Sequence, residues 1–424
     1  MIKADIENTF AQIYESRGNF ERAEPLFHEA LSVAKQAGKP GSRLVILYLN
    51  NFGSFLTSAG RFQEAEPVLR EALAAYQALD TATSEDLAMA SGNLATALQR
   101  LKKLEEAETL SREALRLSML DKGDAGLHVP LCMLNLASIL TDRNKTSEAE
   151  KLCSDALMIY RRRPDATKLD VAWCLNNLAF LLKERKALPE SEKLFRESLE
   201  IHIAERGEEH IEVVNCLQNL GSAQLEQQHL GDAEATYRRA LGIARKVVPD
   251  KHPAQATAIG NLAYTLGMES NYDEAITLAR EAMEWHRRND GETNRATVRS
   301  TLMLADLLIE ADRYLEAESL ARRCSGLQKA GSQPATRTTS ADVILGAALA
   351  GMGRFEEAEP LLTAGYKAIK DNFGPGSDRR KRDALRRIVK MYESWNAAKP
   401  DAAREEVIRK WRAEVNRVAS EPGP

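Results

Sequence analysis

Small residues recur along this chain with a period of 42 residues. The clearest series occupies one fixed position and consists of Ala23, Ala65, Ala107, Ala149, Ser191, Ala233, Ala275, Ala317 and Ala358. Every step in that series is 42 residues except the last, which is 41. Two further series of small residues keep the same step, one lying seven residues after the first series and the other twelve residues before it. Self-similarity at a fixed period indicates a solenoid, in which each repeat buries its apolar face against its neighbours.

The segment 171–202 shows what one repeat contains. Apolar residues recur at steps of three and four on both sides of residues 186–189, and this spacing predicts two amphipathic helices. Pro189 suits the first turn of the second helix, where a missing N–H loses no bond, and we expect Pro25, Pro67 and Pro360 to lie similarly early in theirs. The chain is therefore predicted to be all-α. We place nine antiparallel hairpins and a pair of capping helices at about residues 4–45, 46–87, 88–129, 130–171, 172–213, 214–255, 256–297, 298–338, 339–380 and 381–424.

These features resemble the tetratricopeptide repeat (TPR). The resemblance rests on Leu-Gly or Leu-Ala in the first helix, on turns such as Gly60-Arg61-Phe62, and on the two alanine series. The period exceeds the usual value of about 34, and with phrases such as LNNLA and EAE it is similar to the repeats of kinesin light chains and many bacterial proteins. The chain lacks the heptad coiled coil that precedes the repeats of kinesin light chains. The resemblance covers roughly residues 4–380 and implies a right-handed superhelical solenoid whose first helices line a concave side.

Charge and hydropathy narrow the choice of partners. The 58 basic and 62 acidic residues give a net charge of −4, which offers no general reason to expect nucleic acid as a partner. The basic run 379–382 is flanked by Asp378 and Asp383, so we interpret it as a solvated helix entrance, and we expect the basic residues of 385–392 to make the outer side of the cap polar. No signal-peptide core and no apolar run of membrane-spanning length is found. A cytoplasmic protein with no membrane partner is predicted.

Neither the cysteines nor the histidines form a metal-binding pattern. Cys132, Cys174 and Cys216 share one repeat position, where a cysteine packs as a small hydrophobe. His210 and His252 are 42 residues apart, and each directly precedes a first helix without a second ligand at a usable spacing. The chain also shows no Gly-rich phosphate loop and no nucleophile elbow. We therefore predict no metal, no cofactor and no catalytic activity.

Asparagine occupies one position of the first helix in six consecutive repeats. The series consists of Asn51, Asn93, Asn135, Asn177, Asn219 and Asn261. An asparagine side chain has both donors and an acceptor, so it can pair with the backbone of an extended peptide. In the TPR family the matching asparagines hold peptide backbones in this way. The alternative is that each asparagine bonds to the neighbouring hairpin and stabilises the stack, and the two interpretations are compatible.

Aromatic residues near these asparagines suggest an apolar anchor for such a ligand. They are Trp173, Phe180 and Tyr264, lying four residues before or three residues after an asparagine. The lysines that the carboxylate clamp of chaperone-binding TPR proteins requires are absent from this face, which disfavours a C-terminal carboxylate as the ligand. The predicted peptide-binding residues are Asn93, Asn135, Trp173, Asn177, Phe180, Asn219, Asn261 and Tyr264.

Two functions follow from the sequence. The first is a scaffold that binds an extended or helical segment of a partner protein in the groove lined by the first helices. The second is a regulatory subunit that controls a separate signalling kinase or transcription regulator. The repeats leave no kinase, nucleotide-binding or helix-turn-helix segment in this chain, so any effector would be another protein.

Overall fold

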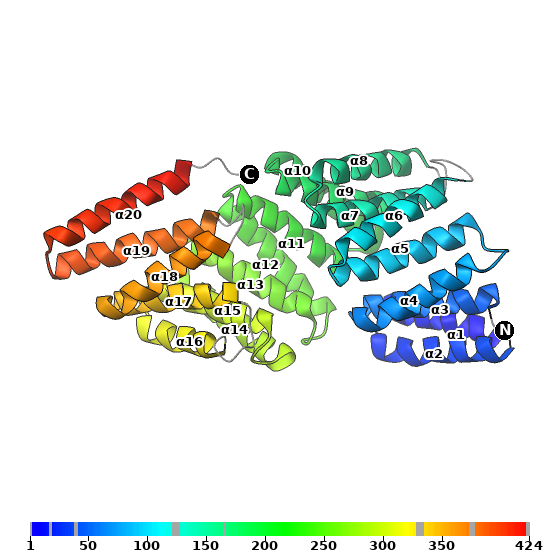
Figure 1. Ribbon diagram of the computed structural model, residues 1–424, viewed down its shortest axis with the longest axis horizontal. Helices are drawn as coiled ribbons and strands as arrows, with labels where there is room; N and C mark the ends of the chain where they lie inside the picture. The colour runs from blue at the N-terminus through cyan, green and yellow to red at the C-terminus, as the bar shows by residue number, and fades with distance from the viewer. Residues whose placement is uncertain are drawn as a thin grey trace. The chain divides into compact units, whose positions relative to one another are not determined.

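The computed structural model describes residues 2–16, 19–37, 41–120, 128–163, 166–327, 335–372 and 378–420. In these residues all regular secondary structure is helical, and twenty helices follow one another along the chain as antiparallel pairs (Figure 1). The all-α prediction is therefore confirmed. In each pair the odd-numbered helix is the first helix of a hairpin and the even-numbered helix is the second.

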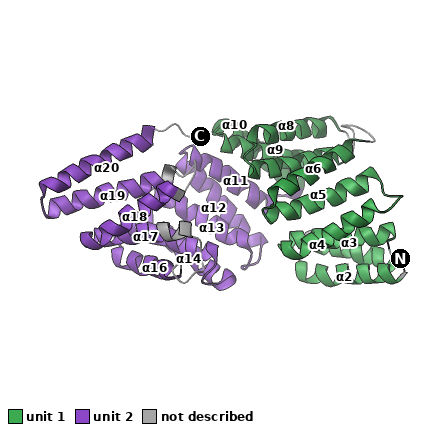
Figure 2. Ribbon diagram, viewed as in Figure 1, with its two compact units in different colours: residues 1–205 green, residues 206–424 purple. Residues whose placement is uncertain are grey.

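The chain divides into two compact units, which we call unit 1 (residues 1–205) and unit 2 (residues 206–424) (Figure 2). The helices of unit 1 are α1 (Ile2–Ser16), α2 (Phe20–Ala37), α3 (Arg43–Ser58), α4 (Phe62–Gln77), α5 (Ser84–Arg100), α6 (Leu104–Met119), α7 (Val129–Asp142), α8 (Thr146–Arg162), α9 (Lys168–Glu184) and α10 (Leu188–Arg206), the last of which ends one residue beyond the boundary. The helices of unit 2 are α11 (Ile211–Glu226), α12 (Leu230–Val247), α13 (Pro253–Met268), α14 (Tyr272–Asp290), α15 (Arg295–Glu310), α16 (Tyr314–Leu327), α17 (Ala335–Gly351), α18 (Phe355–Asn372), α19 (Asp378–Ala398) and α20 (Ala402–Ser420).

The periodic small residues lie at the seam between the two helices of each hairpin. All nine members of the series that begins at Ala23 are completely buried. A Cβ atom added to Gly53 would lie 2.6 Å from the side chain of Leu69, and one added to Gly221 would lie 2.8 Å from the ring of Tyr237. The helices therefore approach too closely for larger side chains, which is the physical reason for the 42-residue pattern.

Serine replaces alanine at this seam in the hairpin of α9 and α10. The Ser191 hydroxyl donates to the carbonyl oxygen of Ala179 at 2.6 Å, and the Ser198 hydroxyl donates to that of Ala172 at 2.9 Å. Both hydroxyls are buried and both are satisfied, so the substitution adds two bonds between the helices without leaving an unpaired polar group.

In the eight hairpins from α3–α4 to α17–α18, the turn contains one residue in the left-handed region. The positions repeat with the same period, at Gly60, Lys102, Asn144, Lys186, Gln228, Ser270, Asp312 and Gly353. Glycine adopts this conformation without steric cost, whereas the other residues of the series adopt it at a steric cost. The Gly-x-Phe turn of the sequence is thus one version of a backbone geometry that every described turn of this series adopts.

The structure places three prolines deeper in their helices than predicted. Pro25, Pro67 and Pro360 are each the sixth residue of α2, α4 or α18, because those helices begin at the phenylalanine directly after the turn. At that depth the missing N–H removes one intrahelical bond, to the carbonyl four residues earlier. The prediction that these prolines lie in the first turn is wrong by about one turn.

Both loop histidines have a structural role at the start of a first helix. Nδ1 of His210 accepts a hydrogen bond from the backbone N–H of Glu212 at 3.1 Å, and Nδ1 of His252 accepts one from that of Ala254 at 3.2 Å. Each imidazole therefore caps one of the N–H groups that a helix start leaves unsatisfied. Within the described residues no group of three or more His, Cys, Asp or Glu side chains is arranged to hold a metal ion.

The five cysteines are buried and form no disulfide. Burial raises the pKa of the Cys153 and Cys174 thiols to about 12, so both are protonated at neutral pH. Cys132, Cys174 and Cys216, which share the repeat position, pack as small buried side chains, as predicted. In the part of the chain that the structure describes, no helix has the length and apolar character needed to cross a membrane.

Candidate functional site

Three consecutive first helices of unit 1 expose an apolar side chain one turn before an asparagine. The apolar residues are Met89 of α5, Leu131 of α7 and Trp173 of α9, which are 36%, 36% and 40% exposed. Residues four apart share one face of a helix, and α5, α7 and α9 pack against one another in order. Phe180 adds a second aromatic ring to α9, with 43% of its surface exposed. We call these four residues, together with Asn93, Asn135 and Asn177, the unit 1 face.

The asparagines of unit 1 have different partners although they share one repeat position. The Asn51 amide donates to the side chain of Asn8 at 3.2 Å and so links α3 to α1, as the stacking interpretation expects. The Asn177 amide donates to the carbonyl oxygen of Trp173 in its own helix at 3.0 Å. Asn93 and Asn135 are half-buried, and among the described residues no hydrogen-bond partner is seen for either side chain. One asparagine therefore links hairpins, one bonds within its own helix, and the other two have no hydrogen-bond partner among the described residues.

The remaining predicted residues belong to unit 2. Asn219 lies on α11, and Asn261 and Tyr264 lie on α13, all three with half-buried side chains. Tyr264 lines a cavity of about 770 Å³. Asp306, 42 residues after Tyr264, occupies the corresponding position of α15 and lines the same cavity. Asn219 and Asn261 are not among the residues that line this cavity.

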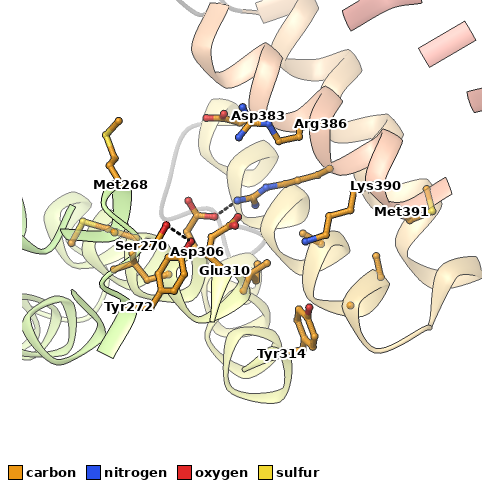
Figure 3. A pocket seen from close by; sticks show the side chains of 18 of the residues that line it. Met268, Ser270, Tyr272, Asp306, Glu310, Tyr314, Asp383, Arg386, Lys390 and Met391 are labelled. Atoms are coloured by element: carbon orange, nitrogen blue, oxygen red, sulfur yellow. Dashed lines mark hydrogen bonds and ion pairs between the residues drawn. The ribbon is translucent and has the colours of Figure 1, made fainter. Parts of the chain in front are cut away.

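The walls of this cavity come from the first helices α13, α15, α17 and α19, from the turns that follow α11, α13 and α17, and from the first residues of α14, α16 and α18. Figure 3 shows Asp306 and Glu310 of α15 on one side and Arg386 and Lys390 of α19 on the other. Between the two sides, the guanidinium of Arg387 forms an ion pair with the Asp306 carboxylate. The Arg387 side chain is only 15% exposed, so this pair fixes a largely buried cation.

Aromatic and sulfur-containing side chains supply the less polar part of the lining, among them Tyr272, Tyr314 and Met268. The Tyr314 hydroxyl donates to the Asp312 carboxylate. That hydrogen bond, together with burial, raises the pKa of Tyr314 to about 12. The phenol is therefore neutral at physiological pH and acts as a hydrogen-bonding, partly apolar wall.

The basic residues of α19 do not lie where the sequence predicts. Those of 385–392 were expected to make the outer side of the cap polar, but Arg386, Arg387 and Lys390 line the cavity, as does Arg382 of the basic run 379–382. The other side of α19 packs against α20. The spacing of 382, 386 and 390 indicates one face of a helix, but which neighbour that face meets depends on packing after the regular period ends.

Comparison with known families identifies the repeats. Two tetratricopeptide repeat models match the chain, one at residues 3–78, 44–119, 85–162, 170–246 and 254–330 and the other at 339–362. These segments cover far more than half of the sequence, so the chain belongs to the tetratricopeptide repeat family. A search of curated protein sequences finds no significant match.

Several solved structures are similar to this chain. A Rap protein complexed with competence and sporulation factor is 14% identical, has a TM-score of 0.56, and aligns over 89% of this chain and 100% of its own. The apo quorum sensor NprR of B. thuringiensis is 13% identical, with a TM-score of 0.57 over 87% of this chain and 100% of its own. A putative kinesin light chain of Podosopora anserina is 16% identical, with a TM-score of 0.44 over 48% of this chain and 95% of its own. At these identities the likeness to the Rap protein and to NprR shows the fold alone.

Proposed function

We propose that this chain is a non-catalytic scaffold that binds an extended segment of a partner protein on the unit 1 face. The observation that carries the proposal is the repetition on α5, α7 and α9 of a half-buried asparagine with an exposed apolar residue one turn before it. A structural role alone does not require Trp173 and Phe180 to be exposed, whereas a binding surface does. A protein is the expected partner, and nucleic acid is not, because the net charge of the chain is negative.

The asparagines and the aromatic residues of the unit 1 face contribute to binding in different ways. The Asn93 and Asn135 amides offer hydrogen bonds to the ligand backbone, and these bonds form whatever side chains the ligand carries. Trp173 and Phe180 offer apolar area on one helix, where a large side chain of the ligand loses its contact with water. Backbone bonds therefore set the path of the segment, and the aromatic pair selects the residue that anchors it.

A regulatory role is the second candidate. The fold is shared with a protein described as a quorum sensor and with a Rap protein bound to competence and sporulation factor. In that role, binding on the unit 1 face would control a separate kinase or transcription regulator. Both candidates use the same surface, and the identity of the captured partner separates them.

The test places a photo-crosslinking amino acid at position 180 in the full chain expressed in its native cells. The matched control carries the same amino acid at position 193, an exposed site on the second helix α10. We expect one partner to crosslink at position 180 and not at position 193, and to be lost when Trp173→Ala is added. Equal crosslinking at both positions, or none at position 180, would contradict the proposal.

A further inference from the structure

Three basic side chains form a row along one wall of the unit 2 cavity, which the carboxylates of Asp383 on the same helix and Glu310 on α15 also line. Arg382, Arg386 and Lys390 lie four residues apart on α19, are all exposed and all line the cavity. No ion pair to any of the three is seen in the residues that the structure describes. Like charges at this spacing repel each other on a helix. The α19 wall therefore carries four cations and one carboxylate, and this excess of positive charge favours an anionic ligand.

A fourth cation of the same wall already holds a carboxylate. Arg387 pairs with Asp306 across the cavity, and this pair joins α19 to α15 (Figure 3). The Asp306 side chain is 47% exposed whereas that of Arg387 is 15% exposed, so the carboxylate is the accessible partner. The pair shows that this wall can bind a carboxylate group. The neighbouring row provides three more cations, which can bind the carboxylates of a ligand.

The remaining lining limits what kind of anion fits. Tyr264, Tyr272, Tyr314 and Met268 contribute surface that a small inorganic anion would leave uncovered. A volume of about 770 Å³ lies within the range of cavities that hold ligands of a few residues. A ligand with carboxylates on one side and apolar side chains on the other matches both walls.

We propose that the unit 2 cavity is a second binding site, which takes an acidic peptide segment whose glutamates or aspartates meet the α19 row while its apolar side chains meet the tyrosines. Asp306 competes with the ligand for Arg387. All residues that line this site belong to unit 2, and none belongs to the unit 1 face.

The probe is a fluorescein-labelled peptide of alternating glutamate and leucine, measured by fluorescence polarisation against the full chain. The comparison peptides replace glutamate by glutamine or by lysine. We expect the acidic peptide to bind at least about tenfold more tightly than the glutamine peptide, with an affinity that falls as salt is added. Equal affinity for the acidic and glutamine peptides, or no binding of the acidic peptide at millimolar concentration, overturns the proposal.

Variants locate the site. Arg382→Gln with Arg386→Gln should weaken the acidic peptide by about tenfold or more. The control pair Arg288→Gln with Arg409→Gln removes the same charge from exposed arginines outside the cavity and should change little. Asp306→Asn should strengthen binding severalfold, because it frees Arg387. If the control pair loses as much affinity as the cavity pair, the effect comes from the net charge of the chain, and the peptide does not bind in the cavity.

One further variant keeps this inference separate from the proposed function. Phe180→Ala alters the unit 1 face only and should leave binding of the acidic peptide unchanged. If Phe180→Ala abolishes that binding while the cavity pair does not, the acidic peptide binds the unit 1 face, and the cavity proposal fails while the proposed function stands.

Discussion

At the scale of single residues, the same side chain does different work in different repeats. Asn51 meets another asparagine, Asn8, and bonds to it, whereas Asn93 and Asn135 have no such neighbour in the described residues. The sequence predicted where these side chains lie, because the helical period fixes the face. It could not predict their hydrogen-bond partners, because a partner such as Asn8 lies in a different repeat and does not belong to the periodic asparagine series.

Glu108 is a residue whose protonation should affect stability. Burial of this carboxylate favours its neutral form, but hydrogen bonds from Lys145, Arg112 and Arg143 outweigh burial and lower its pKa from 4.5 to about 2. Because the pKa of this carboxylate is lower in the folded than in the unfolded state, its ionised form stabilises the fold at pH values above the ordinary pKa. This stabilisation is lost as the pH falls toward 2. The stabilisation should therefore be complete above about pH 5 and decline below pH 4.5.

We predict that Glu108→Gln lowers the free energy of unfolding by about 2 kcal/mol at pH 7, because three cations lose their shared partner. The same variant should lose less stability than the parent between pH 4.5 and pH 2. Urea denaturation at several pH values measures both effects. Glu113→Gln is the control, since its exposed pair with Arg116 contributes little. Parallel pH profiles for parent and Glu108→Gln would contradict the prediction.

At the scale of helices, the turn and the seam define each hairpin. The left-handed turn residue ends the first helix, and the small residues of the seam hold the second helix against it. Ion pairs then connect successive hairpins, since arginines on one second helix meet glutamates 36 residues later on the next, as in Arg70–Glu106 and Arg238–Glu274. These features are periodic, which is why the sequence alone predicted the hairpins.

The turns offer a direct test of backbone strain. Lys102 has φ of 62°, a conformation that suits glycine better than lysine. Lys102→Gly should therefore stabilise unit 1 by about 1 kcal/mol. Gly60→Ala makes the reverse change at the equivalent turn, where φ is 78°, and should destabilise by a similar amount. Chemical denaturation of both variants should show shifts of opposite sign, and shifts of the same sign would refute the assignment of strain to this position.

At the scale of the molecule, stability is spread over neighbouring hairpins. Within each unit, helices pack against the next one along the chain, and first helices such as α3, α5 and α13 also pack against the first helix of the following hairpin. The periodic part of this arrangement was predictable from the sequence. The unit 2 cavity was not, because its cationic wall belongs to α19, where the small-residue series has ended and only packing decides which face turns inward.

Overpacking the seam of one hairpin should therefore destabilise that hairpin and, to a smaller extent, the helices packed against it. Ala149 is completely buried between the helices α7 and α8, so Ala149→Trp forces them apart. We expect hydrogen exchange to become faster in α7 and α8 and, less strongly, in α6 and α9. Lys193→Trp, at an exposed position, should leave exchange unchanged. Unaltered exchange in Ala149→Trp would mean that the seam is assigned wrongly.

The role of the unit 1 face is tested most directly by measuring both affinity and stability in one double variant. Asn135→Ala removes an amide contact worth about 1 kcal/mol, and Phe180→Ala removes an aromatic anchor worth about 2 kcal/mol. If the two effects add, the partner captured at position 180 should bind about a hundredfold more weakly. The melting temperature should stay close to that of the parent, because neither side chain is fully buried. A variant that melts much lower yet binds its partner as before would show that the unit 1 face is structural and that the ligand binds elsewhere.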